Sequence, residues 1–162
     1  MEDISVWFGR MCQGEENEIS DFVWRVFEEY EAKDYSPQGI AEFKSFIEPE
    51  FLAKRYAQIG FFLLCCKEDE KLAGVLAIRD FSHISLLFVA RDFQRRGIAH
   101  RLLELAIEHC RSLDGNLDAI TVNSSRYAIK VYEKLRFEKT GPELEKNGIR
   151  HTPMRLKIDR AA

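Results

Sequence analysis

Residues 86–110 decide the fold and read LLFVARDFQRRGIAHRLLELAIEHC. They open with an apolar run, part of a predicted strand over 84–90 whose uninterrupted apolar character predicts cover on both faces. A charged loop follows, and apolar residues then recur at helical spacing, which predicts a helix over 97–111. The first N–H groups of a helix have no internal partners, and Gly97 lacks a side chain that would keep an anion away from them. A strand, a basic loop with glycine and a helix N-terminus in this order are typical of a phosphate-binding loop.

Several cationic side chains accompany this loop. Arg95 and Arg96 precede the glycine and His100 follows it, so all three are expected to place positive charge near a bound phosphate. Residues 94–99, QRRGIA, resemble the Q/R-x-x-G-x-G/A signature of the GCN5-related N-acetyltransferases, the GNAT superfamily. The chain departs from the family at Arg91, where the family often has proline.

In the GNAT family this loop grips the pyrophosphate of acetyl-coenzyme A. The resemblance therefore implies that acetyl-coenzyme A is the cosubstrate. It assigns cofactor binding to the loop and to the end of the strand before it, namely Phe88, Val89, Ala90, Gln94, Arg95, Arg96, Gly97, Ile98, Ala99 and His100.

A second block, residues 123–137 with the sequence NSSRYAIKVYEKLRF, is similar to the family's N-x-x-A-x-x-x-Y-E-K-x-G-F block. One extra residue follows Asn123, and Arg136 replaces the usual glycine, which predicts a different ending for this helix. The resemblance implies that Asn123 helps to hold the pantetheine arm, whereas the residue alone is interpreted as part of a helix N-cap. It also implies that Tyr132 donates a proton to the departing coenzyme A thiolate, since a phenol with a pKa of about 10 is protonated at neutral pH. The alternative for Tyr132 is a buried tyrosine whose hydroxyl bonds a carbonyl.

The rest of the chain supplies further elements. Ser36 and Pro37 predict the start of a helix that ends before Pro49, and Asn147 with Gly148 predicts a hairpin turn. The other predicted helices span 16–30, 50–55 and 127–135, and the other predicted strands span 4–8, 61–66, 72–79, 118–122, 137–140 and 149–158. Their order fits the GNAT fold, so the resemblance implies one α/β N-acetyltransferase domain over residues 1–162. Its mixed, mostly antiparallel sheet is expected to have about seven strands, flanked by about four helices.

Composition narrows the class of protein. The chain has 162 residues, of which 46% are apolar, and its apolar runs are shorter than the ~18 residues that span a bilayer. The N-terminus does not resemble a signal peptide, and the four cysteines form no C-x-x-C pair, so we expect reduced core cysteines in a cytoplasmic protein. Cys65 and Cys66 should point to opposite faces of their strand.

The net charge of −3 argues against nucleic-acid binding. The expected partners are a small-molecule or peptide amine, with no nucleic acid and no membrane, in a monomer or homodimer.

The charges are unevenly distributed. Residues 15–50 contain eleven acidic side chains against Arg25, Lys33 and Lys44, whereas residues 91–101 contain four arginines against Asp92. Two regions of opposite sign suit two ligands of opposite charge, and an acidic acceptor region would favour a cationic amine. The alternative is that the acidic region is a solvated helix face.

The implied reaction is a direct transfer in which a neutral amine attacks the thioester. A backbone N–H near Val89 is expected to stabilise the oxyanion. The candidates for the general base are His83, with an expected pKa near 6.5, and Glu42 on the helix that begins at Pro37, and water is an alternative. His109 and His151 lack metal-ligand spacing, so no metal is expected.

Nucleophilic catalysis is not indicated. The chain has no G-x-S-x-G or G-x-x-x-x-G-K-S/T motif, and Cys110 falls on the apolar stripe of its helix. Two other functions remain open: a non-catalytic coenzyme A sensor of the same fold, and a phosphate- or nucleotide-binding module of another fold. Retention of both Tyr132 and Asn123 favours the enzyme over the sensor.

Overall fold

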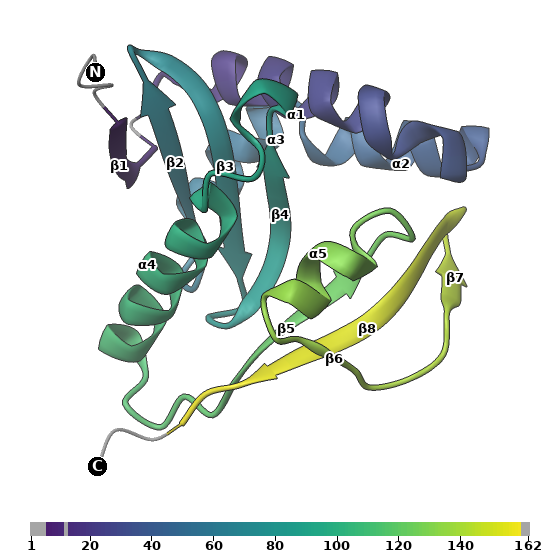
Figure 1. Ribbon diagram of the computed structural model, residues 1–162. Helices are drawn as coiled ribbons and strands as arrows, with labels where there is room; N and C mark the ends of the chain where they lie inside the picture. The colour runs from purple at the N-terminus through teal and green to yellow at the C-terminus, as the bar shows by residue number, and fades with distance from the viewer. Residues whose placement is uncertain (1–5, 12, 160–162) are drawn as a thin grey trace.

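The computed structural model describes residues 6–11 and 13–159, and Figure 1 shows their arrangement. Eight strands and five α-helices form this part of the chain. In chain order they are β1 (Val6–Arg10), α1 (Glu16–Tyr30), α2 (Pro37–Phe46), α3 (Pro49–Tyr56), β2 (Phe62–Glu68), β3 (Lys71–Arg79), β4 (His83–Val89), α4 (Ile98–Leu113), β5 (Ala119–Ser124), α5 (Ile129–Lys134), β6 (Glu138–Lys139), β7 (Leu144–Lys146) and β8 (Ile149–Lys157). Two 3₁₀ turns, η1 (Ala32–Asp34) and η2 (Arg91–Phe93), follow α1 and β4. The predicted α/β class is confirmed, and residues 4 and 5 of the first predicted strand lie outside the described residues.

The strands form a mixed sheet in the order β1-β2-β3-β4-β5-β8-β6, with β7 paired to β8. All pairs are antiparallel except β4 and β5, which run parallel, so the predicted mostly antiparallel sheet is confirmed. β4 is paired with β3 from His83 to Val89. In contrast, β4 and β5 pair only at His83 with Thr121 and at Ile84 with Val122. Beyond Ile84 the two strands diverge, and the second half of β4 has no neighbour on that side (Figure 1).

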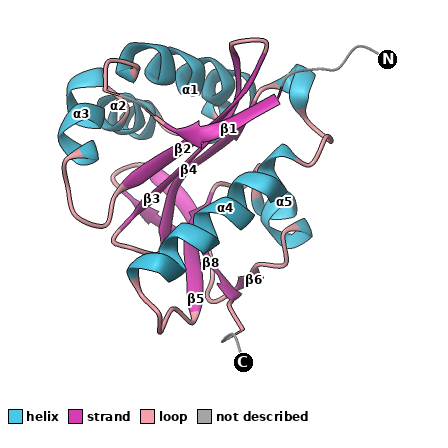
Figure 2. Ribbon diagram, turned by 90° about the vertical axis from the view of Figure 1, so that its left-hand side faces the viewer, coloured by secondary structure: helices cyan, strands magenta, loops and turns pink. Residues whose placement is uncertain are grey.

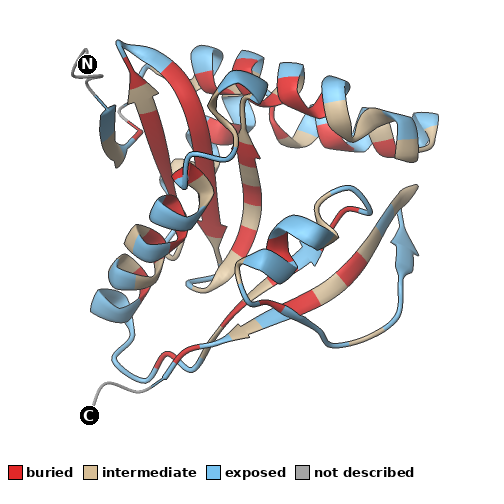
Figure 3. Cartoon of the chain, in the orientation of Figure 1, coloured by how far each residue is buried: buried red, intermediate tan, exposed pale blue. Residues whose placement is uncertain are grey.

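β4 is less covered than its sequence predicts. Burial alternates along the strand, with Leu86 and Phe88 buried but Leu87 and Val89 half-buried (Figure 3). The expectation of cover on both faces of residues 84–90 is confirmed in part, because Leu86 and Phe88 are buried on one face while Leu87 and Val89 pack, half-buried, against the apolar cluster of the other. The divergence of β5 leaves this part of β4 without a neighbouring strand on that side.

The helices cover both faces of the sheet. α1, α2 and α3 lie on one face, and α4 and α5 lie on the other (Figure 2). Each face has its own apolar cluster, and Cys65 and Cys66 belong to different clusters, so their predicted opposite orientation is confirmed. Their thiols and that of Cys110 are buried and free. No helix within residues 6–11 and 13–159 is long and apolar enough to cross a membrane.

The β7–β8 hairpin is fastened to the start of α2. Ser36 caps α2 by accepting a hydrogen bond from the Gly39 N–H at 3.1 Å, and Pro37 occupies the first helical position, as predicted. The Ser36 hydroxyl also donates to the Gly148 carbonyl at 3.1 Å. Asn147 and Gly148 form the predicted turn with positive φ angles of 53° and 78°. This contact places the hairpin tip beside α2, on the far side of the gap between β4 and β5 from α4 (Figure 1).

The helix α5 ends with Arg136 in the left-handed conformation that the family's glycine would adopt at this position. Arg136 has φ +73°, its N–H donates to Glu133 O at 2.9 Å, and the Phe137 N–H donates to Tyr132 O at 2.9 Å. These two bonds are those of a Schellman motif with Arg136 in the left-handed position. The prediction of a different helix ending is wrong, because the two hydrogen bonds hold an arginine in a conformation that glycine adopts at lower cost.

Candidate functional site

The loop between β4 and α4 presents a row of free backbone N–H groups. Arg95 and Gly97 are left-handed, with φ of 64° and 79°, and α4 begins one residue later than predicted, at Ile98. Among the described residues, none accepts a hydrogen bond from the backbone N–H groups of residues 95–100, since the first bond of the helix runs from Arg101 to Gly97. A side chain at Gly97 would meet no atom within 4 Å. Such a concave set of amides at a helix N-terminus can bind an anion.

Two of the three predicted cationic side chains of this loop are paired with carboxylates of the protein. Arg96 binds the buried carboxylate of Glu68 on β2, with Nη1 3.1 Å from Oε2, and its guanidinium lies over the Phe93 ring at 5.4 Å. His100 is paired with Glu104 at 2.6 Å. Only Arg95 among these three predicted ligands is exposed without an ion pair to a described residue. Arg96 therefore fixes the loop to the sheet.

The end of β4 directs one backbone N–H into the gap. The Ala90 N–H donates to Ala73 O on β3 at 2.9 Å, so the N–H and carbonyl of Val89, which point the other way, face the gap left by β5. The Val89 carbonyl accepts a hydrogen bond from Gln94 Nε2 at 3.1 Å. Gln94 thus holds the loop against the strand and leaves the Val89 N–H as a donor in the gap.

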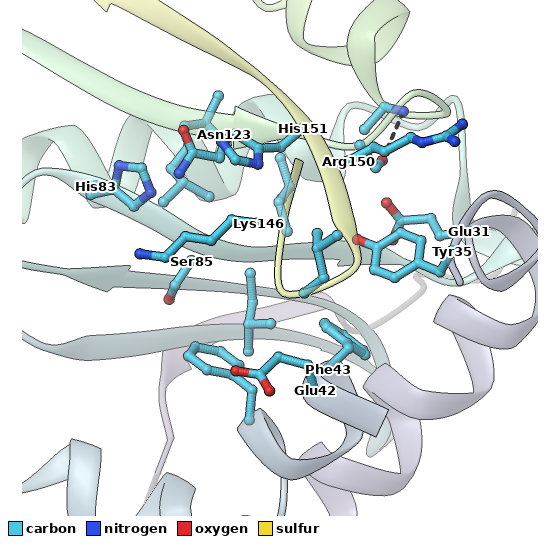
Figure 4. Close-up of a pocket in the computed structure, with 18 of the residues that line it drawn as sticks. Glu31, Tyr35, Glu42, Phe43, His83, Ser85, Asn123, Lys146, Arg150 and His151 are labelled. Carbon is cyan, nitrogen blue, oxygen red and sulfur yellow. Dashed lines mark hydrogen bonds between the residues drawn. The ribbon is translucent and has the colours of Figure 1, made fainter. Parts of the chain in front are cut away.

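A cavity of about 340 Å³ lies along the first part of β4. Its walls come from β4, β5, α2, α5, the segment after α1 and the β7–β8 hairpin (Figure 4). Five residues predicted from the sequence line it, namely Glu42, His83, Phe88, Asn123 and Tyr132. The predicted residues of 89–100 lie outside this lining, beyond the C-terminal end of β4. The two groups of predicted residues therefore lie at the two ends of the same gap.

Tyr132 reaches this cavity from α5. Its side chain is 5% exposed and packs edge-to-face on Phe137, with ring centroids 5.3 Å apart. No described residue forms a hydrogen bond with its hydroxyl, so the predicted alternative of a carbonyl-bonded structural tyrosine is not observed. Burial raises the pKa of Tyr132, and the nearby Glu31 and Tyr35 raise it further. Its hydroxyl is therefore a protonated donor without a fixed partner.

His83 lies at the start of β4. Its Nδ1 is 2.8 Å from Thr121 Oγ1 on β5. Burial, and then the charge of Arg79, lower the pKa of His83 to about 4, so the expected value near 6.5 is wrong for this site. The imidazole is neutral at physiological pH and is a weak proton acceptor. Glu42 is exposed on α2 and lines the cavity opposite β4.

Asn123 is a strand residue and not the predicted helix cap. It pairs with Pro153 in the sheet, and its side chain lines the cavity (Figure 4). The cap of the next segment is Ser125, whose Oγ accepts from the Ala128 N–H at 3.2 Å. The capping prediction fails at Asn123 because β5 continues through Ser124.

Several residues that line the cavity were not predicted from the sequence. Glu31 and Tyr35 enter from the segment after α1, and Lys146, Arg150 and His151 enter from the β7–β8 hairpin (Figure 4). The acidic excess over 15–50 included Glu31 without distinguishing it from its neighbours. The hairpin residues join the site only through the long-range contact of the hairpin tip with α2.

Metal-dependent chemistry and nucleophilic catalysis by Cys110 have little support within the described residues. Residues 6–11 and 13–159 contain no group of three metal-ligating side chains. Burial raises the pKa of the Cys110 thiol to about 11, which leaves it protonated and packed in the core.

Comparison with known proteins agrees with this geometry. A family model described as "Acetyltransferase (GNAT) domain" matches residues 31–158. No protein of curated function matches the sequence.

Similar solved structures include a GCN5-related N-acetyltransferase from Rhodopseudomonas palustris, with a TM-score of 0.78, 18% identity, and 98% and 99% of the two chains covered. The PaiA N-acetyltransferase from Thermoplasma acidophilum, in complex with coenzyme A, has a TM-score of 0.77 and 14% identity over 96% of this chain and 100% of that one. A spermidine N-acetyltransferase from Vibrio cholerae, in complex with CoA and spermine, has a TM-score of 0.64 and 15% identity over 94% and 95%. At these identities the likeness concerns the fold.

Proposed function

Because the chain belongs to the GNAT acetyltransferase family, we propose that it transfers an acetyl group from acetyl-coenzyme A to a primary amine. The proposal takes residues 1–162 as one N-acetyltransferase domain that works in the cytoplasm. The observation that carries it is the gap between β4 and β5. This gap has a concavity of free backbone N–H groups at one end and the unpartnered hydroxyl of Tyr132 at the other.

The cofactor would lie along this gap. Its pyrophosphate would bind the free N–H groups of residues 95–100, helped by the positive end of the α4 dipole and by Arg95. Its pantetheine arm would follow β4 past Phe88 and Val89 toward Asn123 on β5. The coenzyme A complex of the similar Thermoplasma acidophilum protein supports this choice of cofactor.

The reaction would be a direct transfer. The acceptor nitrogen attacks the thioester carbonyl, and the Val89 N–H, which faces the gap, donates to the developing oxyanion. As the carbon–sulfur bond breaks, the Tyr132 hydroxyl gives its proton to the thiolate. Because burial raises its pKa, this hydroxyl is protonated at neutral pH and has a proton to donate when the thiolate forms.

The acceptor is proposed to be a cationic small-molecule or peptide amine. Glu31 and Glu42 line the cavity without an ion pair to any described residue. Of the lining cations, Arg79 and Arg150 are paired with Asp80 and Glu145, and Lys146 has no ion pair to a described residue. Glu42, on the rim, would attract the ammonium. His83, neutral and bonded to Thr121, would line the site as a hydrogen-bonding group. The similar spermidine N-acetyltransferase acts on a cationic amine of this kind.

The direct test is release of free thiol from acetyl-coenzyme A in the presence of five amines. These are spermidine, kanamycin, ethanolamine, glutamate and a tripeptide with a free N-terminus. We expect amine-dependent thiol release that is fastest with spermidine or kanamycin. Coenzyme A binding without thiol release for any of the five would favour a non-catalytic sensor instead.

A further inference from the structure

Glu31 occupies an unusual place for a carboxylate. It follows α1 directly, with its N–H bonded to Phe27 O at 2.8 Å, and its partly buried side chain lines the cavity beside Tyr35 (Figure 4). Tyr132 enters the same cavity from α5. Although Glu31 and Tyr132 come from distant parts of the sequence, both line the same cavity.

No described residue neutralises this carboxylate. Three cations line the cavity, and Arg79 pairs with Asp80, Arg150 pairs with Glu145, and Lys146 has no ion pair to a described residue. None of the three forms an ion pair with Glu31. A carboxylate that is withdrawn from water without a counter-ion costs stability. Such an arrangement is expected where the missing positive charge is supplied by a ligand.

The electrostatics agree with this arrangement. Burial raises the pKa of Glu31, a hydrogen-bonding contribution from the Ser125 hydroxyl opposes the shift, and the charge of Asp34 adds to it. The other titratable or charged groups that share its cavity are Tyr35, Glu42, Arg79, His83, Tyr132, Lys146, Arg150 and His151. A carboxylate with a raised pKa is a stronger base than an exposed one.

We propose that Glu31 is the residue that binds the ammonium group of the acceptor and removes its proton before attack on the thioester. This assignment rests on the proposed acetyl transfer. It deepens that function by giving the amine a specific position, between Glu31 and the thioester at the end of the gap near Tyr132.

The protons balance over the cycle. Glu31 takes one proton from R–NH₃⁺, and the neutral amine forms the new carbon–nitrogen bond. When the carbon–sulfur bond breaks, Tyr132 protonates the thiolate, and the second proton on the nitrogen returns to the Tyr132 phenolate. Glu31 then loses its proton to solvent, so each turnover yields the amide, the free thiol of coenzyme A and one proton.

The other two candidates suit other roles. Glu42 is exposed, so water screens its charge and weakens its attraction for an ammonium. His83 would hold a proton only below about pH 4, given its lowered pKa. Glu31 alone among the three combines a negative charge with partial burial in the cavity.

The test compares Glu31→Gln with wild type, using whichever of the five amines the wild-type protein acetylates fastest. Glu28→Gln is the matched control, because Glu28 is exposed in the last turn of α1, three residues before Glu31, and lies outside the cavity. We expect Glu31→Gln to lower kcat/KM at about pH 7 by ~10²–10³, a typical effect of losing a general base. The control should retain the wild-type value, and Glu31→Asp should recover part of the loss.

The pH profile separates proton transfer from simple attraction. In wild type, kcat/KM should rise with pH and reach a plateau at a pH below the pKa of the amine, because Glu31 removes the proton inside the complex. In Glu31→Gln it should keep rising by about one log unit per pH unit until the amine itself is deprotonated. Parallel profiles for the two proteins would overturn the assignment, as would an unchanged rate.

Stability gives a readout that does not depend on turnover. Since folding raises the pKa of Glu31 above its ordinary value of 4.5, the stability it contributes is lost as the pH rises through the folded pKa. Glu31→Gln should therefore have a melting temperature at neutral pH equal to or above that of wild type. A clear drop would assign Glu31 a structural role.

If the wild-type protein acetylates none of the five amines, the proposed function itself fails. That result is distinct from equal activity of wild type and variant, which would overturn only the assignment of Glu31.

Discussion

Gly97 and Arg95 adopt left-handed conformations in the β4–α4 loop, whose free N–H groups are the proposed anion site. The glycine and the flanking arginines were predicted from the sequence, because the motif is local. The ion pair of Arg96 was not, because its partner Glu68 lies on β2, far away in sequence. Glu31 was equally hidden, since its position depends on where the chain goes after α1 relative to α5.

At the scale of a single residue, Gly97→Glu tests the proposed anion site. The new carboxylate would stand where a pyrophosphate should approach free N–H groups, and the left-handed φ adds a strain of about 1 kcal/mol. We expect at least a tenfold loss of coenzyme A affinity by calorimetry, while the protein remains folded by circular dichroism. Gly115→Glu is the control, because Gly115 is exposed and a side chain there meets no atom within 4 Å. Equal affinities for the two variants would contradict the assignment.

Individual elements were predictable where the signal is carried by a few adjacent residues. Ser36 with Pro37, and Asn147 with Gly148, behave as predicted because their conformational preferences are strong. The β2–β3 turn at Asp69 and Glu70 has the same left-handed geometry, with φ of 49° and 67°, but its residues do not favour it and its type was not predicted. The divergence of β5 from β4 could not be predicted from the residues of either strand, because strand pairing depends on segments that are distant in sequence.

The end of α5 provides a prediction at the element scale. Arg136 is exposed and held at φ +73°, where glycine pays no steric penalty. Arg136→Gly should stabilise the protein by about 0.5–1 kcal/mol, measured by urea unfolding, because relief of this strain exceeds the added entropy of the unfolded chain. A stability loss of similar size would mean that the side chain of Arg136 makes a contact that outweighs the strain.

At the scale of the whole molecule, the fold divides the charges between the two proposed ligand sites. The basic residues of 91–101 surround the loop, while the acidic region of 15–50 supplies Glu31 and Glu42 to the cavity. The sequence predicted this division, but most of the acidic side chains lie elsewhere on the helices. The alternative of a solvated face therefore describes residues such as Glu28.

Salt dependence tests this division of charge. Added salt should raise KM for spermidine more than for ethanolamine, because screening acts over about 8–10 Å. Glu42→Lys should raise KM for spermidine several-fold, with Glu28→Lys as the control for net charge. Faster turnover of glutamate than of spermidine would show that the cavity carboxylates do not select the acceptor.

The most direct test of acetyl transfer at this site is the turnover of Tyr132→Phe beside its acetyl-coenzyme A affinity. The variant removes one hydroxyl that has no hydrogen-bond partner among the described residues, so its stability and cofactor binding should stay close to those of wild type. If that hydroxyl protonates the departing thiolate, kcat should fall by ~10²–10⁴. A variant that turns over at the wild-type rate would contradict the account.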